Sequence, residues 1–142
     1  MRKLVVDASV CLKWVFEEED SEKARELLVK QAEGEALLLA PSIWEFEVVN
    51  GFASAILRRK VTFPLAKKLF KEILAAKPQI IQVPDLLEKC LENSRRWEIS
   101  AYDSAYVTLA TENGIVLVSS DARLVRKVKS ASVVLLKELV WK

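Results

Sequence analysis

The chain has 142 residues, of which 51% are hydrophobic and 30% charged, and its formal net charge is +2 at pH 7. This balance predicts one globular domain over residues 1–142, long enough to bury a sizeable core, and excludes a disordered chain or a polycation. The absence of histidine excludes Ser-His-Asp triads, Cys-His nucleophile pairs and most zinc sites.

Strand-like runs alternate with helical stretches along the whole chain. The strands are predicted at 3–6, 36–40, 79–83, 115–119 and 132–136. The helices are predicted from Ala8 or Ser9 onward, and at 21–32, 42–60, 64–76, 86–98, 101–112 (followed by Gly114) and 122–128. Strands separated by helices predict an α/β fold with a mainly parallel sheet of about five strands and helices on both faces. Such sheets place ligand sites beyond the carboxyl ends of their strands.

Four acidic residues stand where a chain rarely places a charge. Asp7 ends the first apolar run, Asp121 follows the run at 115–118, and Asp103 opens the sixth helix. Glu47 lies inside a helix that is otherwise almost entirely apolar. Carboxylates at such places are costly unless they are paired or bind a cation. If the fold brings them together, they form an all-oxygen site for Mg²⁺ or Mn²⁺, whose usual task is phosphate chemistry.

Three of these acids also have a purely structural explanation. Asp7 and Asp121 can cap the helices that follow them, because aspartate is a favoured N-cap residue. Ser100 and Asp103 match the spacing of a capping box. One cation bound by four carboxylates accounts for all the acids together, whereas capping must be invoked separately for each helix.

Glu47 is the hardest acid to explain without a ligand. Its helix is apolar all round, which predicts burial on both sides, against the core and against another subunit. We therefore expect Glu47 and Asn50, one turn apart, to point into a protein interior. No basic residue precedes Arg58 in the same helix, whereas Glu45 projects away from Glu47 and is expected to be a rim or interface charge.

Basic residues cluster directly after the last of the four acids. The best candidates for binding a phosphate backbone are Arg123, Arg126 and Lys127, although most such clusters are explained as the solvent-exposed face of a helix. Three tryptophans can stack on unpaired bases, but core or interface packing is the favoured interpretation for them: Trp14, Trp44 and Trp97.

Neither the apolar runs nor the cysteines indicate export or membrane insertion. The apolar runs are short and broken by charges, so we expect no transmembrane helix. The first three residues lead straight into a strand without a signal-peptide pattern. Cys11 and Cys90 lack metal-ligand spacing, and Cys90 is expected to be a buried free thiol that shares a helical face with Leu87 and Leu91. We expect a cytoplasmic protein.

The segments around the four acids resemble the signature segments of a known family. They read VVDASV at 5–10, EVVN at 47–50, YDSAY at 102–106 and SSD at 119–121. In order, spacing and surrounding elements they resemble PIN-domain ribonucleases, above all the VapC toxins of toxin–antitoxin pairs. The resemblance covers essentially the whole chain.

The resemblance implies a three-layer α/β/α sandwich and an endoribonuclease that depends on Mg²⁺ or Mn²⁺. It implies that Asp7, Glu47, Asp103 and Asp121 line one metal-binding catalytic pocket. It further implies a homodimer, a small cognate antitoxin and an RNA substrate. Supporting positions beside the acids, where a side chain could orient a carboxylate or hold a water molecule, are Ser9, Asn50 and Ser119.

Two alternatives remain beside the metal-dependent nuclease. A phosphotransfer enzyme with Asp7 as nucleophile usually needs a second acid two residues later, where this chain has Ser9. The main alternative is a non-catalytic PIN-like module that binds RNA or a protein. Degenerate members usually lose one or more acids, so the presence of all four favours catalysis.

Overall fold

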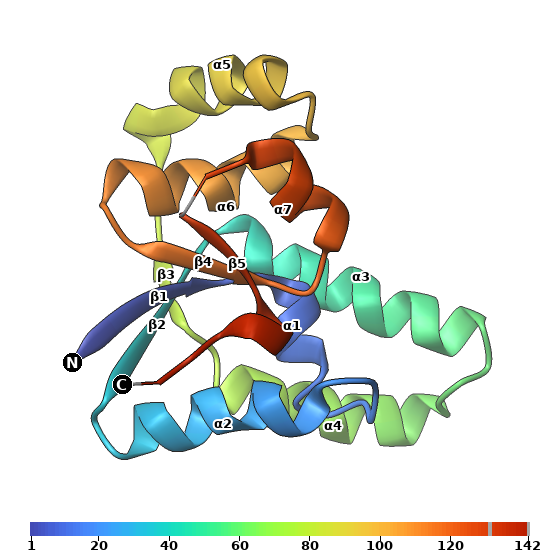
Figure 1. The fold of residues 1–142 in the computed structure, drawn as a ribbon. Coiled ribbons are helices and arrows are strands. Elements are labelled where there is room, and N and C mark those ends of the chain that lie inside the picture. The colour runs from blue at the N-terminus through green and yellow to red at the C-terminus, as the bar shows by residue number, and fades with distance from the viewer. Residues whose placement is uncertain (131, 142) are drawn as a thin grey trace.

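In the computed structural model, which describes residues 1–130 and 132–141, five strands form one parallel sheet between layers of helices (Figure 1). The strands are β1 (Arg2–Val6), β2 (Ala36–Pro41), β3 (Gln79–Ile81), β4 (Val116–Ser119) and β5 (Val133–Leu135). The helices are α1 (Ala8–Leu12), α2 (Ser21–Ala32), α3 (Ile43–Leu57), α4 (Phe63–Ala75), α5 (Leu87–Trp97), α6 (Ala101–Glu112) and α7 (Ala122–Val128). The predicted fold class is confirmed, with the sheet parallel throughout.

The order of the strands reverses at the centre of the sheet, between β1 and β4. The order is β3-β2-β1-β4-β5, so the chain moves outward from β1 on one side and then returns to its other side. Ligands of open parallel sheets bind at such a reversal, beyond the carboxyl ends of the strands. The pairing of Val6 with Val118 brings the ends of β1 and β4 level. Asp7 and Asp121, which follow these strands, therefore flank the reversal.

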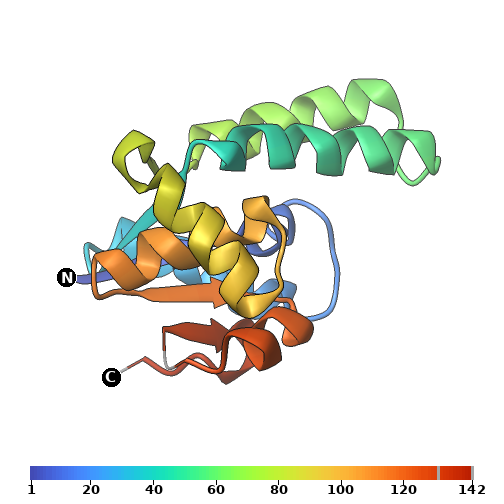
Figure 2. The ribbon, with the colours of Figure 1, turned by 90° about the horizontal axis from the view of Figure 1, so that it is seen from above.

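Helices cover both faces of the sheet. The helix α6 packs on one face with α5 on its outer side, while α1 and α2 lie on the opposite face (Figures 1 and 2). The helices α3 and α4 form an antiparallel pair that projects past the sheet (Figure 2). Because both faces are covered, Leu4, Val5 and Val6 of the central strand are fully buried. This explains why β1 is an unbroken apolar run rather than an alternating one.

Several predicted boundaries differ from the observed ones by one or two residues. The strand predicted at 79–83 ends at Ile81, because Pro84 opens a short 3₁₀ turn over Pro84–Leu86. A second 3₁₀ turn, Leu136–Glu138, follows β5, which ends at Leu135 rather than 136. Gly114 follows α6 as predicted, with a φ of +64° that glycine adopts without a Cβ clash.

The prediction that α3 is buried on both sides does not hold for the single chain. Trp44, Val48 and Phe52 form a buried stripe at intervals of four residues. The side chains of Phe46 and Leu57 on other faces are 75% and 82% exposed. An apolar sequence does not by itself choose the buried face, because that depends on where the neighbouring helix lies.

The helix α5 shows the same difference between sequence and packing. Cys90 is buried and free, as predicted. Leu87 and Leu91, which were expected to share its buried face, are 63% and 71% exposed. Within the described residues, no helix is both long and apolar enough to span a bilayer.

Candidate active site

Asp7 stands at the carboxyl end of the central strand and caps α1. Its Oδ1 accepts a hydrogen bond from the backbone N–H of Ser9 at 3.2 Å, and its Oδ2 accepts one from the hydroxyl of Ser119 at 2.9 Å. Burial raises the pKa of Asp7, and the charge of Asp103 raises it further, while the hydrogen bonds from Ser119 and Ser9 act in the opposite direction. The capping role is therefore present, but it leaves a half-buried carboxylate that forms no ion pair with any described residue.

Ser119 joins the ends of β1 and β4. Its side chain is fully buried, and its Oγ donates to Asp7 while accepting the backbone N–H of Asp121 at 3.1 Å. Asp121 itself caps α7, because its Oδ1 accepts the N–H groups of Arg123 and Leu124 at 2.9 and 3.3 Å. The hydroxyl of Ser119 thus holds Asp7 in orientation across 112 residues of sequence.

Asp103 approaches the same region from α6. Its backbone N–H donates to the Ser100 Oγ at 3.0 Å, which is one half of the predicted capping box. The reciprocal bond, from the Ser100 N–H to the Asp103 carboxylate, is not formed within the described chain. Partial burial raises the pKa of Asp103, as does the charge of Asp121, while Ser100 and Arg123 lower it.

Glu47 reaches the site from the second turn of α3. Its Oε1 is buried and has no hydrogen-bond partner among the described residues. Burial raises the pKa of Glu47, and the charges of Asp7 and Asp103 add to the effect. The Tyr106 hydroxyl lies close enough to lower the pKa of Glu47, but the two groups are not in hydrogen-bonding geometry. By contrast, Glu45 on the same helix lies 3.7 Å from Lys77 and is half exposed.

The four acids therefore share one electrostatic environment. Within the described ranges, none of them forms an ion pair with lysine or arginine. No three His, Cys, Asp or Glu side chains among these residues lie close enough together to hold a metal ion as they stand. Carboxylates that share a site without a cation repel one another, which favours separated rotamers. The all-oxygen donor set and the unpartnered Glu47 Oε1 fit a hard divalent cation.

Two of the predicted supporting residues are exposed. Ser9 donates its backbone N–H to Asp7, and its hydroxyl also lowers the pKa of Asp7, so its predicted place beside this carboxylate stands. Asn50 is exposed rather than pointing into the interior, and its side chain hydrogen-bonds to no described residue. The one-turn spacing from Glu47 rotates Asn50 away from the core stripe of α3.

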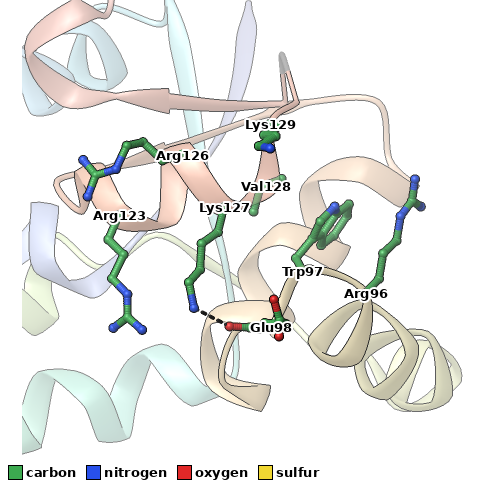
Figure 3. Close-up of a pocket in the computed structure, with 8 residues that line it drawn as sticks. All are labelled: Arg96, Trp97, Glu98, Arg123, Arg126, Lys127, Val128 and Lys129. Carbon is green, nitrogen blue, oxygen red and sulfur yellow. Dashed lines mark hydrogen bonds between the residues drawn. The ribbon is translucent and has the colours of Figure 1, made fainter.

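A basic hollow opens beside the acids, between α7 and the end of α5 (Figure 3). Its volume is about 680 Å³. The residues that line it are Arg96, Trp97, Glu98, Arg123, Arg126, Lys127, Val128 and Lys129. A smaller hollow of about 280 Å³ is lined by Asp103 and Asp121 and shares Glu98, Arg123 and Lys127 with the first. The basic hollow thus adjoins the part of the acidic site formed by Asp103 and Asp121.

The side chains of the basic hollow differ in how firmly they are held. Lys127 donates from its Nζ to the backbone carbonyl of Glu98 at 2.7 Å (Figure 3). The guanidinium of Arg96 lies over the Trp97 ring, 5.1 Å from its centroid. Arg123 and Arg126 are exposed, and neither is in an ion pair with a described residue. These two side chains are therefore available to an anionic ligand.

Sequence reasoning missed part of this surface. Arg96 forms a separate cluster in the sequence, and only the tertiary structure places it in the lining of the same hollow as Arg126. Among the tryptophans, Trp14 and Trp44 are buried in the core, which agrees with the interpretation favoured for them. Trp97 is half buried and lines the hollow. Tyr106 was also missed, although its place three residues after Asp103 puts both on one side of α6.

Comparison with known proteins identifies the family. A family model described as "PIN domain" matches residues 4–130. The crystal structure of PAE2754 from Pyrobaculum aerophilum is similar with a TM-score of 0.73 and 19% identity, over 96% of this chain and 92% of that one. VapBC2 from Rickettsia felis, solved bound to a DNA fragment from its promoter, is similar with a TM-score of 0.61 and 13% identity, over 94% and 96% of the two chains. No significant sequence match was found among curated proteins.

Proposed function

The chain belongs to the PIN domain family, and from this premise we propose that it is a metal-dependent endoribonuclease and the toxin of a toxin–antitoxin pair. PIN domains are generally nucleases. The proposal adds RNA as the substrate, Mg²⁺ or Mn²⁺ as the cofactor, and Asp7, Glu47, Asp103 and Asp121 as the catalytic, metal-binding residues.

One observation carries the proposal. The Oε1 atom of Glu47 is buried without a partner beside Asp7 and Asp103, and the pKa of all three carboxyls is raised, first of all by burial. Such an arrangement costs stability in the absence of a cation, because each charged group is desolvated and repels the others. A bound divalent cation would offset both effects.

The residues present supply what phosphodiester hydrolysis needs. Asp7, Glu47 and Asp103 would hold the cation, with Asp121 binding directly or through water. When bound, the cation supplies Lewis acidity toward water and toward the scissile phosphate. Ser119 keeps the Asp7 carboxylate oriented through the 2.9 Å hydrogen bond. Neither a histidine nor a protein nucleophile is required.

The basic hollow offers a path for the RNA strand toward this site. Arg123, Arg126 and Lys127 line it, and Arg123 and Lys127 also border the smaller hollow that contains Asp103. Phosphates held by these cations would lead the backbone to the acids. Trp97, which lines the hollow from the end of α5, presents an aromatic ring on which an unpaired base could stack.

Exposed apolar side chains support the protein partners in the proposal. Phe46 and Leu57 on α3 and Phe63 on α4 are exposed, and an apolar hollow of about 220 Å³ lies between these two helices. Such surfaces are typical of protein interfaces. The similarity to VapBC2, a toxin–antitoxin complex, favours a small antitoxin, and α3 is also suited to a homodimer. We place the protein in the cytoplasm, where a toxin would meet cellular RNA.

A second candidate function is a PIN-like module that binds RNA or protein without cleavage. It is favoured by the finding that no three described carboxylates stand close enough to hold a cation in their present positions. The two candidates differ in whether a cation binds at the acids.

Metal binding and RNA cleavage separate these candidates. We expect calorimetry to show Mn²⁺ binding to the wild type and to Glu45→Gln, and lost or greatly weakened binding to Asp7→Asn. Cleavage of a structured RNA should follow the same pattern and stop in EDTA. Cleavage by well-folded Asp7→Asn protein, free of contaminating nuclease, would refute the catalytic assignment. RNA binding without metal binding or cleavage would establish the second candidate.

A further inference from the structure

Tyr106 carries a buried polar group that no described residue satisfies. It lies on α6, and 1% of its surface is exposed. Its hydroxyl is buried and without a hydrogen-bond partner in the described chain. A buried hydroxyl in this state destabilises the fold, so a tyrosine rather than a phenylalanine at this place calls for an explanation.

Among the neighbours of the hydroxyl, one acceptor atom has no donor within the described chain. Its neighbours are Glu47, Asp7 and the thiol of Cys11. Both oxygens of Asp7 already accept hydrogen bonds, and the Cys11 Sγ accepts one from the Trp44 indole at 3.3 Å. The Oε1 atom of Glu47 is buried and has no donor. The unsatisfied donor and the unsatisfied acceptor therefore lie next to each other.

We infer that Tyr106 is a positioning residue for Glu47: its hydroxyl donates a hydrogen bond to the Glu47 carboxylate when the site holds a divalent cation. This inference rests on the proposed metal-dependent function. The hydrogen bond would occupy one oxygen of the Glu47 carboxylate and leave the other oxygen free to bind the cation. A tyrosine hydroxyl carries its proton at neutral pH and can therefore donate to a carboxylate. Outer groups that orient a metal-binding side chain commonly change metal affinity by 10- to 100-fold.

The chain provides a matched control for this residue. It contains two tyrosines, and the other one, Tyr102, lies on the same helix with 60% of its surface exposed. Tyr106→Phe and Tyr102→Phe remove the same single atom. We expect Mn²⁺ affinity, measured by calorimetry, to fall about tenfold in Tyr106→Phe and to stay unchanged in Tyr102→Phe. In EDTA, Tyr106→Phe should melt no lower than the wild type, because it removes an unsatisfied hydroxyl. Weaker binding could then not be ascribed to misfolding.

A spectroscopic measurement reports on the hydroxyl itself. Labelling the tyrosines with ¹³C at Cζ yields two signals, which Tyr102→Phe assigns. Addition of Mg²⁺ should shift the Tyr106 signal with the same midpoint as metal binding and leave the Tyr102 signal in place. A Tyr106 signal unmoved at saturating Mg²⁺, or wild-type Mn²⁺ affinity in Tyr106→Phe, would overturn the positioning role alone. If the wild type binds neither cation, the metal site of the proposed function fails and this inference fails with it.

Discussion

Replacing Ser119 with alanine tests how the ends of the two central strands are joined. The substitution removes one buried oxygen that donates to Asp7 at 2.9 Å and accepts the N–H of Asp121 at 3.1 Å. A hydrogen bond to a charged group contributes about 2 kcal/mol and a neutral one about 1 kcal/mol. We therefore expect Ser119→Ala to lower the free energy of unfolding by about 3 kcal/mol. For a domain of this size, that corresponds to a fall in Tm of roughly 9 °C.

The measurement is urea unfolding at pH 8 in EDTA, because alkaline pH favours the charged form of Asp7 and no metal contributes. The neighbouring residue supplies the control, since the Ser120 Oγ is buried without a partner in the described chain. Ser120→Ala should therefore be neutral or slightly stabilising. Equal stabilities for the two alanine variants, within about 0.5 kcal/mol, would show that the hydroxyl of Ser119 does not hold the strand ends together.

Three further predictions concern the acids and the basic hollow. Because the folded-state pKa of Asp7, Glu47 and Asp103 is raised above its unfolded value, protonation favours the folded state. In urea unfolding in EDTA, the free energy of unfolding should thus rise as the pH falls from 8 toward 5. The rise should be smaller in Asp7→Asn, and an equal rise in that variant would contradict the argument. Arg126→Ala should weaken RNA binding and reduce its salt slope by about one, as seen by fluorescence anisotropy, whereas Lys68→Ala on α4 should change neither. Trp97→Leu should weaken the binding of single-stranded RNA by about 1–3 kcal/mol and the binding of duplex RNA much less. Equal losses of binding free energy for the two RNAs would exclude stacking.

Local patterns were enough to predict the elements of the fold and the strand-end acids. The apolar runs before Asp7 and before Asp121 each indicate a buried strand. Because the two strands are parallel, their carboxyl ends lie on the same side of the sheet. The N-cap positions of Asp7 and Asp121 could also be predicted from the sequence, because an N-cap is a contact between residues two or three positions apart. Both aspartates cap the helices that follow them, as this local pattern predicts.

Contacts between distant segments were not predictable in the same way. The periodicity of α3 did not distinguish the buried stripe of Trp44 and Val48 from the exposed Phe46, because both lie on apolar faces. The exposed Asn50 was misplaced for the same reason. Arg96 and Arg126 line one hollow although 30 residues separate them, because the fold places the end of α5 across this hollow from α7.

The sequence by itself determined which segments are helices and strands and which carboxylates follow the ends of the central strands, because these follow from hydrophobic periodicity and from the geometry of parallel sheets. Only the tertiary structure decided which side chains meet there. The bond between Ser119 and Asp7 and the approach of Tyr106 to Glu47 join residues on separate elements. Such contacts depend on the relative placement of packed helices and strands, which no local pattern encodes.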